Sequence, residues 1–226
     1  ISILIGFPLG YLGLRNKGKK GDYISRIIGI SSYAIPPFWG AMLAQLIFSV
    51  YFRIFPIGGR FPIFNQQPQI TGFLVLDSIL DKNIFALQDC LYHLALPSLT
   101  LGFLLSGIFS RSLRTNLEKS IKSDFVNAAL CRGITRRKII FNHALPNALL
   151  PIVTISGLTI ASLAGGALLF EVTFSWPGIA LRLYEAISQR DYTLVLGIVI
   201  ITSLLIVSLN LFVDILIALL DPRIEY

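Results

Sequence analysis

Four long runs of apolar residues constrain this chain more than any other feature of its sequence. They cover residues 27–52, 91–110, 149–170 and 193–220, and each is close to the roughly 20 residues that a helix needs to cross about 30 Å of hydrocarbon. Because hydrocarbon offers no partner to backbone N–H and C=O groups, segments this long must be helices. The sequence therefore predicts an all-α, polytopic bundle of transmembrane helices, forming a single transmembrane domain over residues 1–226.

The composition agrees with a chain whose solvent is lipid. Hydrophobic residues make up 54% of it and charged residues 14%, whereas an ordinary soluble domain is about 25% charged. A fifth apolar piece, residues 1–14, is too short to span and lacks the basic start and cleavage site of a signal peptide. We expect it to be a partial span, the end of a helix in a chain truncated at its N-terminus.

Basic residues are distributed unevenly among the segments that connect the apolar runs. Fourteen of the 19 Lys and Arg residues lie in residues 15–26, in residues 111–138 or at Arg223, and five lie in residues 53–82 and 182–190. Because basic loops stay in the cytoplasm, this asymmetry predicts a multi-pass protein of the cell membrane with a cytoplasmic C-terminus. The net charge of +7 thus reflects topology, and no nucleic acid is expected as a partner. Cys90 falls outside and Cys131 inside, which excludes a disulfide between them.

Two features inside the apolar runs are unusual. Pro36 and Pro37 should break or kink the first run, either as a structural kink or as a flexing point that lines a passage. Asp214 lies within the last run, where a charge costs about 2.5–3.5 kcal/mol. It should face protein or water, paired with a basic residue of the 111–138 segment or close to the inner interface. The residues that we regard as candidates for a pathway or gate are Pro36, Pro37, Trp39 and Asp214.

The segment from residue 111 to residue 148 is the most informative one. Leu113, Leu117, Ile121 and Phe125 recur every four residues, which predicts a helix that continues out of the membrane. Gly133 follows, and glycine allows a left-handed turn without a steric penalty. A second helical run then extends to Leu145 and Pro146. The pattern predicts a cytoplasmic loop made of a helix, a glycine turn and a helix.

This loop resembles that of the inner-membrane permeases of ABC importers. Their loop carries Glu-Ala-Ala, three residues, Gly, nine residues and then Ile-x-Leu-Pro; here the same spacing runs from Asn127-Ala128-Ala129 through Gly133 to Leu145-Pro146, with Asn127 and His143 as departures. Further segments are similar to the dipeptide, oligopeptide and nickel branch of this binding-protein-dependent transport family. They are residues 35–39, 171–178, 190–192 and 219–223.

The resemblance implies a permease subunit that forms the translocation path for dipeptides or oligopeptides. In the family this loop is a coupling loop that docks on a separate cytoplasmic ATPase; the residues concerned here are Asn127, Ala128, Ala129, Arg132, Gly133, Arg136, Arg137, Leu145 and Pro146. The alternative for the loop is a basic helix resting on anionic headgroups of the lipid bilayer. The other implied partners are a second homologous permease subunit and an extracytoplasmic substrate-binding protein. Glu171 and Trp176 are possible contacts of that protein, although Glu171 could equally cap an outer turn.

Several kinds of chemistry have no support in the sequence. No phosphate-binding G-x-x-x-x-G-K-[ST] motif occurs, so ATP is expected to be used by the partner ATPase, with no cofactor bound by this chain. His93 and His143 fall at opposite faces and cannot share a metal. We therefore expect no catalytic residue, no metal site and no enzymatic activity. The alternatives are the same importer class acting on oligosaccharide or nickel, or an ATP-independent channel or carrier.

Overall fold

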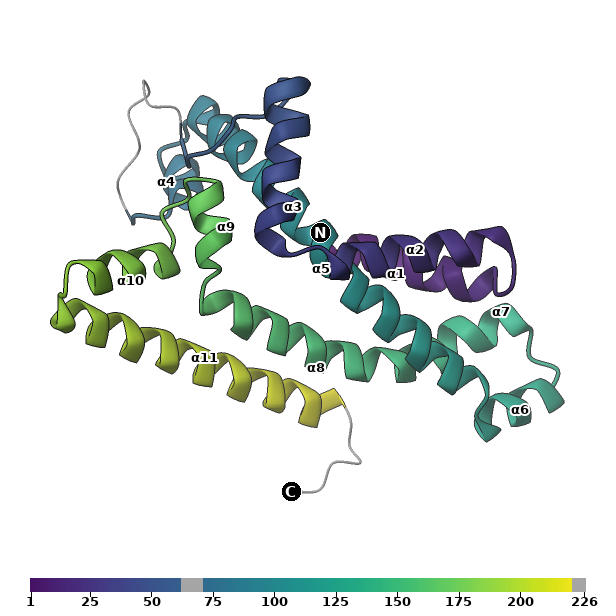
Figure 1. Cartoon of the computed structure of the whole chain (residues 1–226). Coiled ribbons are helices and arrows are strands. Elements are labelled where there is room, and N and C mark those ends of the chain that lie inside the picture. The colour runs from purple at the N-terminus through teal and green to yellow at the C-terminus, as the bar shows by residue number, and fades with distance from the viewer. Residues whose placement is uncertain (62–70, 221–226) are drawn as a thin grey trace. The chain divides into compact units, whose positions relative to one another are not determined.

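The computed structural model describes residues 1–61 and 71–220, and every regular element within these ranges is helical. This confirms the all-α fold (Figure 1). The π-helices are designated η. In chain order the elements are α1 (Ser2–Arg15), α2 (Lys20–Ala34), α3 (Pro37–Ala44), η1 (Gln45–Tyr51), α4 (Leu74–Leu80), α5 (Ile84–Ile121), α6 (Asp124–Cys131), α7 (Arg136–Ile139), η2 (Ile140–Ala144), α8 (Leu145–Ala164), α9 (Leu168–Thr173), α10 (Ile179–Ser188) and α11 (Tyr192–Leu220).

Three helical segments of the described chain are long and apolar enough to cross a membrane. They are Ile84–Ile121, Arg136–Ala164 and Tyr192–Leu219, and a fourth results if α2 and the helix Pro37–Tyr51 form one bent span. The 14 residues of α1 are shorter than a full span. A chain with several such helices is polytopic, as its apolar runs indicated.

Helix bounds differ from the predicted spans at several points. The run 91–110 is the middle of the 38-residue helix α5, and the run 193–220 agrees with α11 to within one residue. The run 149–170 is not one helix, because α8 ends at Ala164 and Phe170 belongs to α9. Gly166 lies between them with a φ of +89°, a left-handed conformation that interrupts a right-handed helix.

The proline pair breaks the first run, as predicted. Helix α2 ends at Ala34, Pro36 is extended with φ −57° and ψ 134°, and Pro37 is the first residue of α3. Proline is well suited to this first helical position because its missing N–H has no intrahelical partner there. Its ring also disfavours a helical conformation in the residue before it, which explains why the chain leaves the helix at this point.

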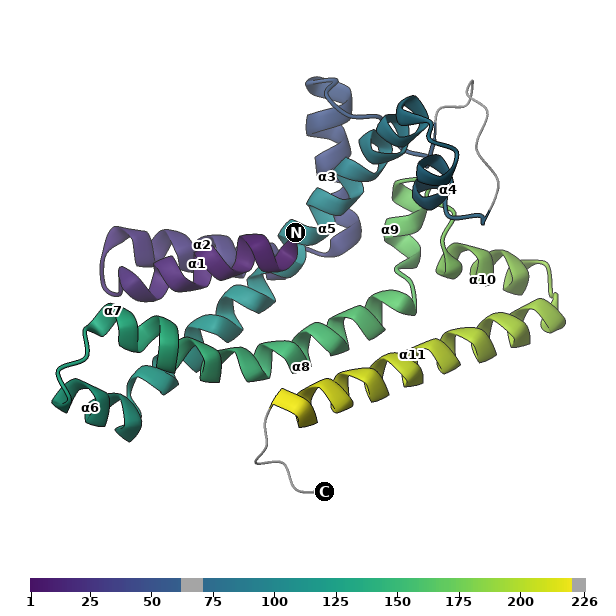
Figure 2. The same cartoon turned by 180° about the vertical axis from the view of Figure 1, so that it is seen from behind.

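The chain consists of two compact units. Unit 1 comprises Ile1–Ala34, Leu105–Gly165 and Leu196–Tyr226, and unit 2 comprises Ile35–Leu104 and Gly166–Val195. In unit 1 the helices α1 and α2 run side by side as a hairpin (Figures 1 and 2), and the Ser25 hydroxyl donates to the Leu9 carbonyl at 2.5 Å. Helix α8 meets α11 closely, since a Cβ atom on Gly157 would overlap the side chain of Val213.

The core of unit 1 lies along the second half of α5. Leu113 and Leu117 are 1% and 0% exposed, and they pack with residues of α8 and of the segment before it. These two leucines belong to the predicted four-residue repeat, which places them on the buried face of α5. The same repeat stops at Ile121, because α5 ends there; Phe125 lies in α6 and is 43% exposed. The prediction that Phe125 continues this face is therefore wrong.

The core of unit 2 joins α3, α5 and α9. Ala41, Leu96, Phe170 and Phe174 are buried together. The Gln45 side-chain amide donates to the carbonyls of Ile57 and Thr173, at 2.6 and 2.7 Å, so one polar side chain ties η1 to two distant segments. This amide satisfies carbonyl groups that would otherwise lack donors.

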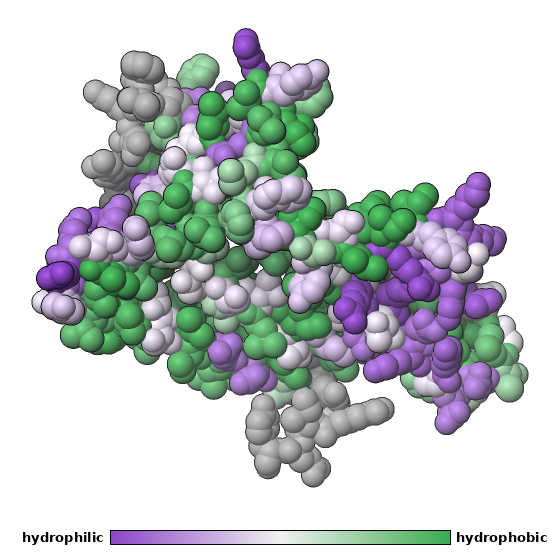
Figure 3. All heavy atoms as spheres, viewed as in Figure 1, coloured by the Kyte–Doolittle hydropathy of each residue, from purple (hydrophilic) through white to green (hydrophobic). Residues whose placement is uncertain are grey.

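Hydrophilic residues gather over α6, α7 and the loop between α1 and α2 (Figure 3). All three are parts of unit 1, and they overlap the basic segments 15–26 and 111–138 of the sequence. The charged surface of unit 1 is thus concentrated in the parts predicted to face the cytoplasm.

Candidate functional site

The candidate site is the segment α6–Gly133–α7, and its turn follows from local hydrogen bonding. The N–H of Gly133 donates to the carbonyl of Leu130 at 2.9 Å, and the N–H of Ile134 donates to that of Ala129 at 3.3 Å. This pair of bonds defines a Schellman motif, which needs a left-handed residue just past the helix end. Gly133 supplies it with a φ of +75°. The sequence pattern of a helix, a glycine turn and a helix is therefore present in the structure.

A small apolar core holds the two helices of this segment together. Val126, Ala129 and Ile139 are buried, and Ile134 packs against them. Ile134 follows the glycine, the position from which an apolar residue contacts the helix that has just ended. The angle between α6 and α7 is thereby stabilised from both sides of the turn.

The remaining side chains of the segment form an exposed face that is both basic and apolar. Of the residues proposed from the sequence, Asn127, Ala128, Arg132, Gly133, Arg136 and Arg137 are exposed, whereas Ala129 is buried. Phe125 and Leu130 are 43% and 49% exposed on the same segment. Within the described chain none of its three arginines forms an ion pair. The face is therefore free to meet a partner with acidic and apolar groups.

The second helix of the loop does not end at Pro146, contrary to the prediction. Helix α7, η2 and α8 form one helical segment from Arg136 to Ala164, and Pro146 lies in the first turn of α8. The π-helical turn of η2 changes the hydrogen-bond register just before the proline, which lets the helix pass it. Leu145 is half-buried against the cores of unit 1, while Pro146 is exposed.

A hydrogen bond anchors this region to α5. The Ser120 hydroxyl donates to the carbonyl of Ala144 at 3.0 Å, and Ala144 itself is fully buried beside Leu117. The base of the α6–Gly133–α7 segment is therefore connected to the end of a long helix. Nothing in the local sequence pattern around Ser120 predicts the distant carbonyl that it contacts.

Glu171 and Trp176 are both engaged within unit 2. The Glu171 carboxylate accepts hydrogen bonds from the N–H groups of Leu181 and Ala167, at 2.8 and 3.4 Å. Trp176 packs against the core around Phe174 and donates its backbone N–H to the Glu171 carbonyl at 2.8 Å. Glu171 therefore caps the start of α10, which agrees with the second of the two roles considered for it.

The candidate pathway residues are exposed. Pro36, Pro37 and Trp39 expose their side chains within unit 2, and Asp214 exposes its side chain on α11 of unit 1. No basic side chain of the described residues lies within ion-pair distance of Asp214. The expected pairing with the 111–138 segment is therefore not found. Arg223 and the rest of the motif from residue 221 lie outside the described residues.

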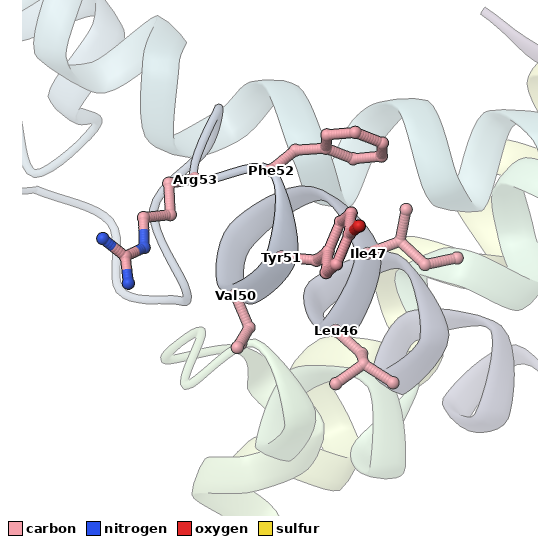
Figure 4. A pocket seen from close by; sticks show the side chains of 6 residues that line it. All are labelled: Leu46, Ile47, Val50, Tyr51, Phe52 and Arg53. Carbon is pink, nitrogen blue, oxygen red and sulfur yellow. The ribbon is translucent and has the colours of Figure 1, made fainter.

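A pocket of about 920 Å³ lies at the end of η1. Figure 4 shows its lining, which is apolar except for the Tyr51 hydroxyl and Arg53. None of the candidate residues lines it. The described residues also contain no group of three His, Cys, Asp or Glu side chains close enough to hold a metal ion.

These features define the class of protein: a multi-pass α-helical membrane protein with a basic segment in which a glycine turn joins two short helices. Residues 2–226 match the family described as the binding-protein-dependent transport system inner membrane component. The chain belongs to this family.

Similar proteins are permease subunits of peptide transport systems. The dipeptide transport system permease protein DppB of Escherichia coli (strain K12) is 32% identical over 225 residues, covering 98% of this chain and 66% of the relative. The di/tripeptide permease DppB of Pseudomonas aeruginosa (strain UCBPP-PA14) is 33% identical over 221 residues, with the same coverage. The oligopeptide permease AppB of Bacillus subtilis (strain 168) is 33% identical over 226 residues, covering 100% and 67%. The chain thus spans about two thirds of the length of these relatives.

Proposed function

We propose that this chain is the permease subunit of an ATP-binding-cassette importer and forms the translocation path for dipeptides or oligopeptides. The observation that carries the proposal is the similarity along nearly the whole chain to permeases of peptide transport systems. Family membership also supports a partner that delivers substrate, since the family consists of components of binding-protein-dependent systems. The chain acts as a non-catalytic subunit and binds no cofactor of its own.

The α6–Gly133–α7 segment is the proposed contact with a separate ATPase subunit. Its exposed face offers three arginines beside Phe125 and Leu130, which suits a groove that combines carboxylates with apolar surface. The apolar core of Val126, Ala129 and Ile139 gives the face a defined shape before binding. A preformed face lowers the ordering cost of association, and it can transmit a displacement to the helix that it joins.

The proposed topology places this segment and the C-terminus in the cytoplasm. The α9–α10 region then lies outside, where it can meet the substrate-binding protein near the exposed residues of α10. A second homologous permease subunit completes the path. Apolar residues cover most of the exposed surface of α11, and such a surface meets lipid or a neighbouring membrane subunit.

The test is reconstitution of the full-length protein with its transport partners. We expect a nucleotide-binding subunit to copurify with it, and labelled dipeptide uptake in proteoliposomes to require both ATP and the binding protein. Triple replacement of Arg132, Arg136 and Arg137 by Glu should reduce ATPase copurification at least tenfold, because each lost contact is charge-assisted. Replacement of Arg182 and Arg190 by Glu, on the proposed outer side, is the control.

Two outcomes would redirect the proposal. Uptake that proceeds without ATP and without a copurifying ATPase would identify a channel or carrier instead. ATP-dependent uptake of nickel or an oligosaccharide, with no uptake of peptides, would keep the importer class and replace the substrate.

A further inference from the structure

A groove in unit 1, distinct from the α6–Gly133–α7 segment, combines charged and apolar walls. It has a volume of about 960 Å³ and lies mainly between α2 and α5, and Lys17 of the α1–α2 loop and Ile155 of α8 also line it. None of the residues proposed for coupling, gating or binding-protein contact lines it. The proposed transport function therefore leaves this groove unexplained.

Two contacts establish how the groove is oriented. Near the start of α2, Asp22 pairs with Arg114 of α5 at 2.5 Å. Further along α2, Gly29 meets Gly107, because a Cβ atom on Gly107 would overlap the Gly29 carbonyl. Residue numbers rise along α2 as they fall along α5, so the helices are antiparallel where they form the groove.

This orientation separates the two kinds of wall. Lys17, Arg26 and Arg114 lie at the Asp22 end, whereas Ile108 lies beside the contact of Gly107 with Gly29 and Tyr33 lies beyond that contact on α2. Eleven residues of α2 separate Asp22 from Tyr33, which corresponds to about 16 Å of helix. One leaflet is roughly 20 Å thick including its headgroups, so the change from charged to apolar occurs over the thickness of a single leaflet.

The charged end carries an excess of positive charge. Lys17, Arg26, Arg111 and Arg114 line the groove with one carboxylate, Glu118. Asp22 is the further carboxylate paired with these cations, so the cations outnumber the carboxylates by two. Asp22 forms ion pairs with both Arg26 and Arg114, and Lys17 pairs with Glu118 at 2.5 Å. Arg111 has no ion-pair partner among the described residues.

Arg114 adds a donor that lacks an acceptor. Its Nη1 atom pairs with Asp22 at 2.5 Å, whereas its Nη2 atom is buried and has no hydrogen-bond acceptor among the described residues. Buried donors in native proteins nearly always have an acceptor. Arg111 and Arg114 both line the groove, and guanidinium groups attract phosphate and match its geometry well.

The apolar end is open to an occupant. Ile30 and Tyr33 are 67% and 66% exposed on the groove side of α2, which leaves a hydrophobic surface in line with the cationic end. A soluble anion would use the charged end alone. A molecule with a phosphate at one end and a hydrocarbon chain at the other would use both.

We propose that this groove binds one anionic phospholipid, with its phosphate against Arg111 and Arg114 and an acyl chain along Ile30, Tyr33 and Ile108. Basic pockets between membrane helices are suited to anionic headgroups. The bound lipid belongs to the leaflet on the side of the α1–α2 loop, which is cytoplasmic in the proposed topology. The site itself does not depend on the identity of the transported substrate.

The experiment measures lipid retained by the purified full-length protein in its transport complex, by native mass spectrometry after exchange into phosphatidylglycerol or phosphatidylcholine. We expect one phosphatidylglycerol to be retained in preference to phosphatidylcholine. Arg111→Gln should weaken that retention about fivefold, since one basic residue contributes about 1 kcal/mol. Lys119→Gln removes the same charge from the same helix outside the groove and should change it less than twofold.

A second pair of variants examines the apolar end and separates a lipid from a free anion. Ile30→Ser should lower phosphatidylglycerol retention without changing how much of the lipid inorganic phosphate displaces. Ile27→Ser is its control, because Ile27 is 63% exposed on α2 but outside the groove. Equal losses for Arg111→Gln and Lys119→Gln would overturn the site. Displacement of the lipid by millimolar inorganic phosphate, or no preference for phosphatidylglycerol, would also overturn the proposal.

Discussion

The Glu171 carboxylate accepts a hydrogen bond from the backbone N–H of Leu181 at 2.8 Å, which connects α9 to the first turn of α10. The first N–H groups of a helix have no partner within it, so an acceptor from another segment stabilises the helix start. Gly178 makes this approach possible, since a side chain there would overlap the carboxylate. Residues 171–178 are therefore a structural unit, whatever they meet outside it.

Replacing Glu171 should destabilise this unit. We expect Glu171→Ala to lower the free energy of unfolding by about 1 kcal/mol, the usual effect of losing an N-terminal cap, whereas Glu171→Gln keeps an acceptor oxygen and loses less. Thermal unfolding of the purified protein in detergent measures the difference. Glu185→Ala removes an exposed carboxylate paired with Arg182 and should have little effect. Equal shifts for Glu171→Ala and Glu185→Ala would contradict the capping role.

Gly133→Val should impair coupling more than folding. The left-handed turn at Gly133 makes a side chain cost about 1–2 kcal/mol, although no atom lies within 4 Å of the position that its Cβ would occupy. That cost misplaces α7 without unfolding the bundle. Substrate-stimulated ATPase activity and uptake should both fall at equal subunit content. Gly72→Val is the control, because Gly72 has a φ of +87° and open space in the proposed outer segment; unchanged uptake by Gly133→Val would refute the coupling role.

The adjacent residues Ala128 and Ala129 should respond differently to the same substitution. Ala129 is 8% exposed in the core with Val126 and Ile139, so Ala129→Asp buries a charge and loosens the segment. Trypsin should then cleave at Arg132, Arg136 or Arg137 several-fold faster. Ala128→Asp should leave the cleavage rate unchanged and reduce ATPase copurification. Equal cleavage rates for the two variants would contradict the burial of Ala129.

Cysteine labelling in intact cells tests the orientation. Cys90 is 3% exposed beside Phe61 and Ala86, so it should resist maleimide from either side even though its segment is predicted to face outward. A better outward probe is Ser188→Cys, at an exposed position of α10. We expect it to react with an impermeant maleimide in intact cells, and Cys131 to react only after permeabilisation. Rapid labelling of Cys131 in intact cells would reverse the topology.

Asp214→Asn should affect assembly more than selectivity. The carboxylate is exposed on an apolar helix and has no basic partner among the described residues, so we expect another subunit or water to cover it in the membrane. Recovery of the second permease subunit with the variant should fall several-fold, and Ser208→Ala on the same helix should leave it unchanged. Normal assembly with an altered substrate preference would instead make Asp214 a pathway residue.

Some features of the site were predictable because their causes are local. The turn at Gly133 depends on one residue that tolerates positive φ and on hydrogen bonds within six residues. The break at Pro36 and Pro37 follows from a missing N–H and a fixed ring. The ion pair of Asp22 with Arg26 could also be predicted from the four-residue spacing of the two residues. The second ion pair of Asp22, with Arg114, could not.

From the amino-acid sequence alone it followed that the chain is helical, that it has several long apolar segments, and that Pro36 and Pro37 interrupt the first of them, whereas the interruption at Gly166 did not follow. These properties follow from hydrophobic length and from the backbone's need for hydrogen bonds in lipid. The structure was needed to learn that Ala129 is buried while Ala128 is exposed, that Phe125 leaves the face of Leu113 and Leu117, and that the helix continues past Pro146. The burial of Ala129 depends on its packing against Ile139 of the next helix, and the other two outcomes depend on the end of α5 at Ile121 and on the π-helical turn before Pro146. The hydrogen bond from Ser120 to Ala144 joins residues that are farther apart, and a local pattern contains no information about such a partner.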